Sequence, residues 1–140
     1  MTNIFLVLIS LVVASPAFAK TALVYKGPGS CEDGCSEASA DVARLAGLTP
    51  VYIGPNEKNL AIFDDAVVWL QPGGVSNTVA KKMNSILKNA LKEFIAEGGG
   101  YVGFCAGGFL ATEIVGETDT KGLGIIAGIS SLLEVKGNPQ

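Results

Sequence analysis

The chain has 140 residues, of which 49% are hydrophobic and 16% charged, with three cysteines and no histidine. This length fits one domain, and the hydrophobic share excludes a disordered chain, which requires low hydrophobicity and high charge. A formal net charge of −3 provides no electrostatic attraction to nucleic acid or to an anionic membrane. The absence of histidine removes the usual general base at neutral pH and the commonest metal ligand.

The first 19 residues have the layout of a secretory signal peptide. An apolar run over residues 4–13 is followed by small residues that end in Ala17-Phe18-Ala19. We predict cleavage after Ala19, which leaves residues 20–140 as one secreted or periplasmic domain without stable membrane insertion. The alternative is an uncleaved anchor, but residues 4–19 are fewer than the roughly 20 that a spanning helix needs, and Pro16 would interrupt them.

The remaining chain alternates between strand and helix patterns. The first predicted helix begins at Ser36 as its N-cap and ends at Gly47, with Ala38, Val42, Leu45 and Ala46 as its apolar face. A long helix is predicted from Asn77 or Thr78 to Gly98, and a short one over residues 109–115. Strands are predicted over residues 21–25, 50–54, 66–70, 101–104, 122–126 and 129–135. This alternation predicts an α/β fold, a parallel sheet with helices on both faces.

Glycine-rich segments follow three of the predicted strands. They are Gly27-Pro28-Gly29, Pro72-Gly73-Gly74, and the run from Gly103 to Gly108. In open α/β sheets, ligands bind beyond the carboxyl ends of the strands. We therefore expect these segments to form one site.

Cys105 lies at a predicted strand-to-helix turn, with glycines two residues before and two residues after it. This G-x-C-x-G pattern is the cysteine counterpart of the G-x-S-x-G nucleophile elbow, in which a helix amino end favours the thiolate. The Ala106 amide could donate to an oxyanion, together with an amide of Gly73 or Gly74. The alternative is a small buried residue at a glycine-rich turn.

These segments, in this order, resemble the biotin-protein ligase N-terminal domain family of the class I glutamine amidotransferase-like superfamily. The resemblance covers roughly residues 22–115, and the Gly103-Phe104-Cys105-Ala106-Gly107-Gly108 block is its most specific part. It implies a flavodoxin-like three-layer sandwich with a mainly parallel sheet. It also implies that Cys105 occupies the nucleophile position and that Gly74 and Ala106 supply the oxyanion amides.

The chain departs from the superfamily pattern in two ways. Class I amidotransferases pair their cysteine with a later histidine and glutamate, and no histidine occurs in these 140 residues. The sequence also stops at Gln140, soon after the point where family domains continue, so it is either a shortened domain or incomplete. Biotin transfer is not implied, because the ligase family performs it in a different domain. Whether the chain is an enzyme stays open.

The other two cysteines lie close together in the sequence. In an exported protein two of three cysteines are expected to pair, and we favour a Cys31–Cys35 disulfide that leaves Cys105 free. A bond from either to Cys105 would instead mask the nucleophile or create a redox-responsive site. Metal binding by three cysteines fits export poorly, so neither a metal nor a cofactor is expected.

A carboxylate could replace the missing histidine, although a carboxylate is a poor base at neutral pH unless its pKa is raised. For each candidate we favour a solvated surface acid. These candidates are Glu32, Asp33, Glu37, Glu113, Glu117 and Asp119.

The sequence supports three hypotheses. In the first, an exported amidotransferase-like domain binds a small carbonyl or carboxylate ligand in a strand-end pocket, and conventional hydrolysis is lost or severely reduced. That pocket would be lined by Gly29, Gly73, Gly74 and Cys105. In the second, Cys105 serves a hydrolase or transferase acting on an amide, thioester or carbonyl. In the third, the domain is a structural interaction module. The sequence does not indicate an oligomeric state.

Overall fold

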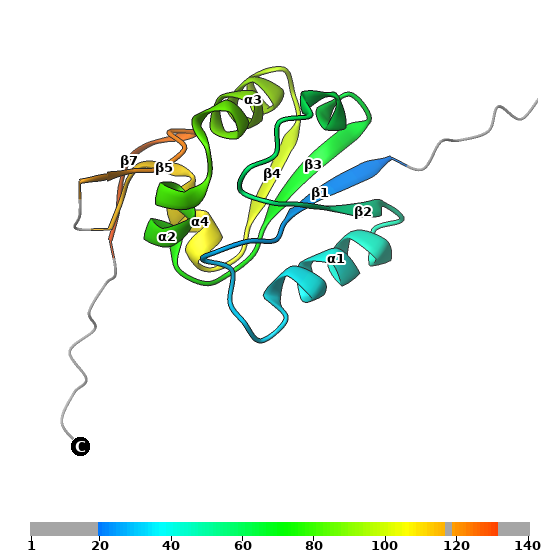
Figure 1. The fold of residues 1–140 in the computed structure, drawn as a ribbon, viewed down its shortest axis with the longest axis horizontal. Coiled ribbons are helices and arrows are strands. Elements are labelled where there is room, and N and C mark those ends of the chain that lie inside the picture. The colour runs from blue at the N-terminus through cyan, green and yellow to red at the C-terminus, as the bar shows by residue number, and fades with distance from the viewer. Residues whose placement is uncertain (1–19, 117–118, 132–140) are drawn as a thin grey trace, which may run out of the picture.

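The computed structural model of the chain describes residues 20–116 and 119–131 (Figure 1). The predicted signal peptide, Glu117 and the end of the last predicted strand lie outside this part. Within the described ranges, no helix combines the length and the apolar character that a bilayer span needs.

The main sheet has four parallel strands in the order β2-β1-β3-β4. Apolar and β-branched residues form these strands, as the sequence predicts. Their bounds are β1 Thr21–Tyr25, β2 Thr49–Ile53, β3 Ala66–Gln71 and β4 Gly100–Gly103. A second, small sheet has the order β6-β5-β7, with β5 Thr112–Val115, β6 Thr120–Lys121 and β7 Ile126–Ser130.

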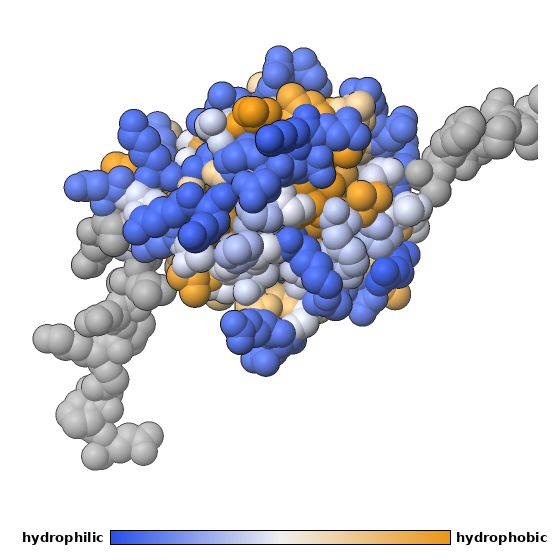
Figure 2. All heavy atoms as spheres, viewed as in Figure 1, coloured by the Kyte–Doolittle hydropathy of each residue, from blue (hydrophilic) through white to orange (hydrophobic). Residues whose placement is uncertain are grey.

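Helices cover both faces of the main sheet, which gives the predicted three layers (Figure 1). Helix α1 (Cys35–Leu45) lies on one face, and α2 (Ser76–Lys82), α3 (Ser85–Ala96) and α4 (Ala106–Leu110) lie on the other. The larger core cluster forms on the second face around Trp69, beside the short 3-10 helix η1 (Leu60–Phe63). On the face seen in Figure 2, hydrophilic side chains cover most of the surface and apolar ones form scattered patches.

Helix α1 turns a different face to the sheet from the one predicted. Leu45 is 89% exposed and Val42 46% exposed, whereas Ala40 and Ala43 are buried. Ser36 and Ser39 are also buried. The Ser36 hydroxyl donates to the Tyr25 carbonyl oxygen at 2.9 Å and the Ser39 hydroxyl to the Cys35 carbonyl oxygen at 2.8 Å, so neither hydroxyl is buried without a partner. Small side chains with satisfied hydroxyls therefore replace the expected apolar stripe.

The predicted start of α1 is also wrong. Ser36 lies inside the helix, and the N-cap is Gly34, which has a φ of 82°. The Ser36 hydroxyl is used to hold α1 against the end of β1 instead.

The predicted long helix is two helices. Met83 ends α2 with extended backbone angles. Asn84 is the N-cap of α3, and its side chain accepts a hydrogen bond from the Leu87 amide at 2.7 Å. Met83, Leu87 and Leu91 remain buried, so the apolar spacing continues across the break. Periodicity alone could not reveal the break, whereas the N-cap preference of asparagine could have.

The segment after Cys105 also differs from the prediction. The helix occupies Ala106–Leu110, directly after the cysteine, and Thr112–Val115 form strand β5 rather than the end of a helix. The β-branched residues Thr112, Ile114 and Val115 favour a strand locally, and the helix prediction did not take this preference into account.

Candidate functional site

The candidate site lies at the carboxyl ends of β1, β3 and β4. These strands are neighbours and parallel, so the segments after Tyr25, Gln71 and Gly103 emerge at one edge of the sheet. The chain winds outward from β1 in one direction to β2 and in the other to β3 and β4. The crevice at such a reversal of strand order is where open α/β sheets bind ligands.

Cys105 lies at this edge in a strained conformation. Its φ of 50° and ψ of −114° make it, among the described residues, the one non-glycine residue with a positive φ. It is the N-cap of α4, and it is exposed and not bonded to another cysteine. Strain of this kind persists only where the surrounding structure imposes it, and it is found most often at functional sites.

The glycines on either side of Cys105 are required by close packing. A Cβ on Gly103 would lie 2.5 Å from the carbonyl carbon of Gly107, and a Cβ on Gly107 would overlap the carbonyl oxygen of Gln71. The Phe104 amide also donates to that Gln71 oxygen at 2.9 Å. The G-x-C-x-G spacing therefore lets α4 fold back directly onto the ends of β3 and β4.

The other two glycine-rich loops are hydrogen-bonded to each other. The Val75 amide donates to the Gly29 oxygen at 2.7 Å, and the Cys31 amide donates to the Gly73 oxygen at 3.0 Å. Ser30 and Gly74 form an isolated β-bridge between these bonds. The structure thus brings Gly29, Gly73 and Gly74 together, and a Cβ on Gly73 would lie 3.5 Å from the Cys105 Cβ.

Backbone amides near Cys105 are free to donate. Among the described residues, the amides of Gly73, Gly74 and Ala106 donate to no backbone carbonyl. Gly73 and Ala106 are buried and Gly74 is exposed. The sequence predicts the Ala106 amide, together with that of Gly73 or Gly74, for an oxyanion site, and this role stays a prediction.

Two tyrosines hold the site loops, and neither was identified from the sequence. Tyr25 donates to the Pro28 oxygen at 3.1 Å, and Tyr101 donates to the Gly107 oxygen at 2.7 Å. Burial raises the pKa of Tyr25 to about 12 and also raises the pKa of Tyr101. Each tyrosine lies in the strand that precedes the segment it holds, Tyr25 in β1 and Tyr101 in β4. This position next to a glycine-rich segment is visible in the sequence and could have identified both residues.

Beneath α4, Gln71 is fully buried. Its Oε1 accepts from the Trp69 indole at 3.1 Å, whereas its Nε2 has no partner among the described residues. The strand predicted from the sequence ends one residue earlier, at Leu70, and Gln71 was not identified as part of the site. The structure makes it the surface on which the elbow rests, because Gly107 packs against its backbone and its Cβ and Cγ atoms.

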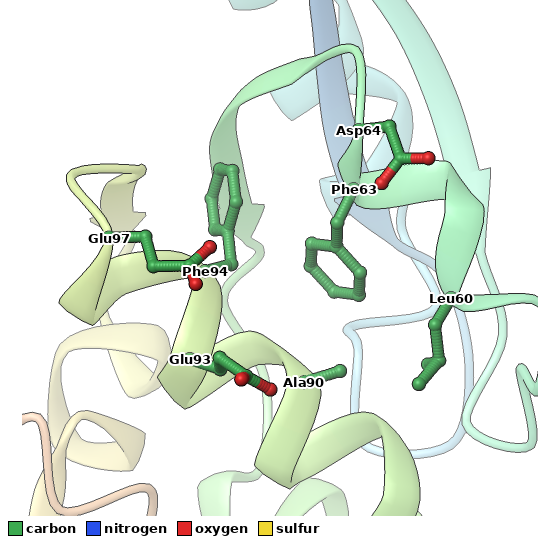
Figure 3. A pocket seen from close by; sticks show the side chains of 7 residues that line it. All are labelled: Leu60, Phe63, Asp64, Ala90, Glu93, Phe94 and Glu97. Atoms are coloured by element: carbon green, nitrogen blue, oxygen red, sulfur yellow. The ribbon is translucent and has the colours of Figure 1, made fainter.

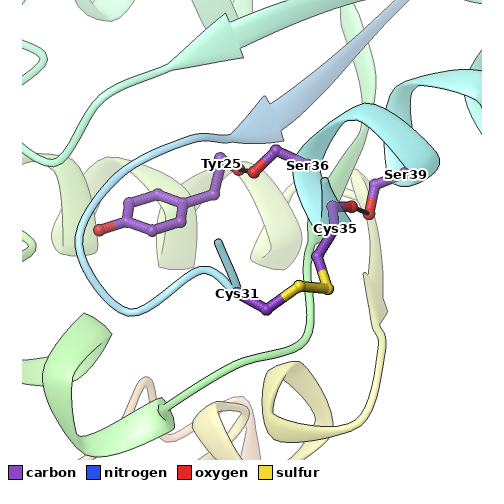
Figure 4. The surroundings of a disulfide bond; sticks show 5 residues. All are labelled: Tyr25, Cys31, Cys35, Ser36 and Ser39. Carbon is purple, nitrogen blue, oxygen red and sulfur yellow. Dashed lines mark hydrogen bonds between the residues drawn. A yellow bond between two sulfur atoms is a disulfide. The ribbon is translucent and has the colours of Figure 1, made fainter. Parts of the chain in front are cut away.

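Cys31 and Cys35 form a close pair at the start of α1 (Figure 4). Their Cα atoms are 5.5 Å apart, a usual separation for a disulfide. Ser36 and Ser39 follow on the helix, and their hydrogen bonds fix this turn beside Tyr25 (Figure 4).

The carboxylates considered as partners of Cys105 have other surroundings. Glu37 forms an ion pair with Lys26 at 2.5 Å, and its pKa is lowered chiefly by the hydrogen bond from that lysine. Glu32 and Asp33 are exposed. Glu113 and Asp119 line a cavity of about 540 Å³ beside the small sheet, together with Lys92 and Lys121.

A further cavity lies away from the candidate site. It has a volume of about 420 Å³ and is formed between η1 and α3, where the rings of Phe63 and Phe94 are 5.3 Å apart (Figure 3). Its lining also includes Asp64, Glu93 and Glu97. Because Phe63 and Asp64 precede β3, this cavity is at the opposite end of the sheet from Cys105.

Comparison with known proteins decides the family. The profile of the family described as "Biotin-protein ligase, N terminal" matches residues 20–127, which is most of the chain. The chain belongs to the biotin-protein ligase N-terminal family. The match contains β1, β3, β4 and the whole Cys105 elbow. No curated protein matches the chain.

A solved structure confirms the fold class of this family member. It is that of a candidate peptidase E protein from Listeria monocytogenes EGD-e, with a TM-score of 0.63 and 13% sequence identity. The match covers 80% of this chain and 66% of the Listeria chain. At this identity the likeness shows the fold alone, a flavodoxin-like α/β fold. The chain spans just under two thirds of that protein.

Proposed function

We propose that this domain binds a small carbonyl or carboxylate ligand at the Cys105 edge of the sheet and that conventional hydrolysis is lost or severely reduced. One observation carries the proposal: a strained, exposed Cys105 is followed by Ala106 and lies near Gly73, and the amides of Ala106, Gly73 and the adjacent Gly74 donate to no backbone group of the described chain. Free amides at one point stabilise negative oxygen. These 140 residues contain no histidine, so they cannot assemble a Cys-His-Glu triad.

Thermal melting with a set of small ligands tests this proposal. Acetate, glyoxylate, glutamate and glutamine are added separately, and at least one is expected to raise the melting temperature of the wild-type protein. Cys105→Trp should abolish that shift by filling the site. Leu45→Trp is the matched control, because Leu45 is 89% exposed on α1 and the shift should persist. A shift that survives in Cys105→Trp would defeat the site assignment.

The exposed and strained position of Cys105 also favours a second function, a hydrolase or transferase acting through its thiolate on an amide, thioester or carbonyl. Iodoacetamide labelling separates the two proposals. An activated nucleophile should be labelled at pH 7 at least ~10-fold faster than a cysteine in an unfolded peptide. Labelling at the rate of the peptide cysteine would count against the enzyme and favour the binding function. A pure interaction module is favoured if no ligand shifts the wild-type melting temperature.

We also propose that the protein is exported with cleavage after Ala19 and that it carries a Cys31–Cys35 disulfide. The A-x-A site before Lys20 supports export, and the 5.5 Å Cα separation supports the disulfide. The mass of the protein recovered outside the cytoplasm should correspond to a chain that begins at Lys20. Recovery with the first 19 residues attached would overturn the cleavage proposal.

A further inference from the structure

All three cysteines of the chain lie around one residue, Gly73. A Cβ built on Gly73 would lie 3.5 Å from the Cβ of Cys105 and 3.8 Å from the Sγ of Cys35. The Cys105 Cβ and the Cys35 Sγ are therefore at most about 7.3 Å apart. Cys31 is tied to the same point, because its amide donates to the Gly73 oxygen at 3.0 Å.

The residue close to both Cys105 and Cys35 carries no side chain. Gly73 is buried, and a methyl group there would make only ordinary contacts, with the Cys105 Cβ at 3.5 Å, the Phe104 oxygen at 3.7 Å and the Cys35 Sγ at 3.8 Å. Cys105 is exposed and unbonded, whereas Cys35 is bonded to Cys31. Among the described residues, no three histidine, cysteine or acidic groups are gathered so as to hold a metal ion.

We infer that Cys105 exchanges with the Cys31–Cys35 disulfide, an inference that rests on the proposed disulfide. The Cys105 thiolate attacks the Sγ of Cys35, the Cys35–Cys105 bond forms, and the Cys31–Cys35 bond breaks. Cys31 leaves as a thiolate and takes up a proton equivalent to the one that Cys105 lost. One disulfide replaces another, so no external oxidant or reductant is consumed.

Exchange would switch the site off reversibly. In the original state the Cys105 thiol is exposed beside the free amides, and in the exchanged state its sulfur is bonded to Cys35 and the free thiol is Cys31. The Cys31 amide bond to Gly73 keeps that thiol near the new disulfide, so the reverse attack remains available. A low-molecular-weight thiol or disulfide that acts on any of the three cysteines would shift this balance.

The Cys31→Ser protein, reduced and freed of reductant, tests the central contact. One equivalent of dithiobis(nitrobenzoate) is added; the first thiol forms a mixed disulfide with release of thionitrobenzoate, and the second thiol displaces another thionitrobenzoate. Two thionitrobenzoates per protein and a chain lighter by two hydrogens are expected. Release of a single thionitrobenzoate per protein, with a thionitrobenzoate adduct retained on Cys35 or on Cys105, would overturn the inference.

Gly73→Ala in the Cys31→Ser background is the matched control, since the added methyl group would contact both the Cys105 Cβ and the Cys35 Sγ. The substitution should slow the release of the second thionitrobenzoate at least ~10-fold, because the methyl group blocks the approach of Cys105 to Cys35. An unchanged rate would show that the contact does not run past Gly73 and would overturn the inference.

Peptide mapping of the wild-type protein covers the case in which Cys31→Ser does not fold. The protein is held at pH 8 in a glutathione redox buffer and quenched with acid. After one short, fixed incubation time, a Cys35–Cys105 linked peptide is expected at pH 8 and should be at least ~10-fold less abundant at pH 5, because scarce thiolate slows the exchange. Mapping that finds only the Cys31–Cys35 link at both pH values would overturn the exchange and leave the proposed disulfide intact. Absence of a Cys31–Cys35 link in untreated protein would instead refute the disulfide proposal itself.

Discussion

Gly107 in α4 packs directly onto the carbonyl oxygen of Gln71 at the end of β3, with no room for a side chain between them. The same oxygen accepts the Phe104 amide at 2.9 Å, and the Gly107 oxygen accepts the Tyr101 hydroxyl at 2.7 Å. The peptide groups before and after Cys105 are thus fixed to two neighbouring strands. This relationship explains how a five-residue helix can hold Cys105 at an unfavourable φ.

Gly107→Ala should therefore destabilise the protein by about 1–3 kcal/mol, the range for overpacking a filled site. The added Cβ would overlap the Gln71 oxygen and push α4 away from β3. Gly108→Ala is the control, because its Cβ would meet nothing nearer than the Gly103 oxygen at 4.0 Å. It should be neutral or stabilising by up to ~1 kcal/mol through helix propensity. Urea unfolding measures both, and equal losses would contradict the packing account.

The strain at Cys105 predicts an unusual ranking of substitutions. Cys105→Gly should be more stable than Cys105→Ala by about 1 kcal/mol, because glycine adopts a φ of 50° without the steric cost that alanine retains. Glycine is normally the less stable of the two in a folded chain, owing to its backbone entropy. Equilibrium unfolding of the two variants checks the ranking, and greater stability of the alanine variant would show that the elbow is not strained.

The sequence was sufficient to predict the parallel sheet and the elbow because both depend on local patterns. The four strands are apolar runs bounded by turn residues, and the G-x-C-x-G spacing is dictated by contacts of Gly103 and Gly107 within the elbow and with β3. The disposition of the three glycine-rich loops followed from parallel strands sharing one edge.

Contacts between distant segments could not be predicted in the same way. The buried face of α1 depends on the Tyr25 carbonyl that accepts from Ser36, and a hydrophobic pattern favours Val42 and Leu45 instead. The break between α2 and α3 depends on Asn84, whose amide donates to the Pro55 oxygen at 2.9 Å. The role of Gln71 beneath the elbow likewise appears only when β3 and α4 are brought together.

The break between α2 and α3 gives a third prediction. Asn84→Ala should destabilise the protein by about 1–2 kcal/mol, because it removes the bond from the Leu87 amide at 2.7 Å and the bond to the Glu57 oxygen at 3.2 Å. Asn89→Ala is the control, since Asn89 is exposed within α3 and alanine is the better helix former there. Thermal or urea unfolding compares them. A loss of equal size in Asn89→Ala would contradict the capping role.

The buried tyrosines predict a loss of stability at alkaline pH. An unfolded tyrosine ionises near pH 10, whereas burial raises the pKa of Tyr25 to about 12 and raises that of Tyr101 as well. Below pH 10 both states are protonated and the contribution is fully present. Above pH 10 the unfolded state loses its proton first, so the free energy of unfolding should fall by up to about 1.4 kcal/mol per pH unit for each tyrosine until its folded pKa is passed.

Urea unfolding between pH 8 and 11 tests this loss, with all proteins carrying Cys105→Ser so that thiol exchange does not contribute. Tyr25→Phe and Tyr101→Phe should each flatten the fall above pH 10, although each begins less stable by about 1 kcal/mol because the bond to the Pro28 or Gly107 oxygen is lost. The Cys105→Ser parent, which keeps both buried tyrosines, is the reference for the slope. Lysine contributions are common to all of these proteins and cancel in the differences. Parallel curves for Tyr25→Phe and the Cys105→Ser parent would refute a protonated, buried Tyr25 as the anchor of the first site loop.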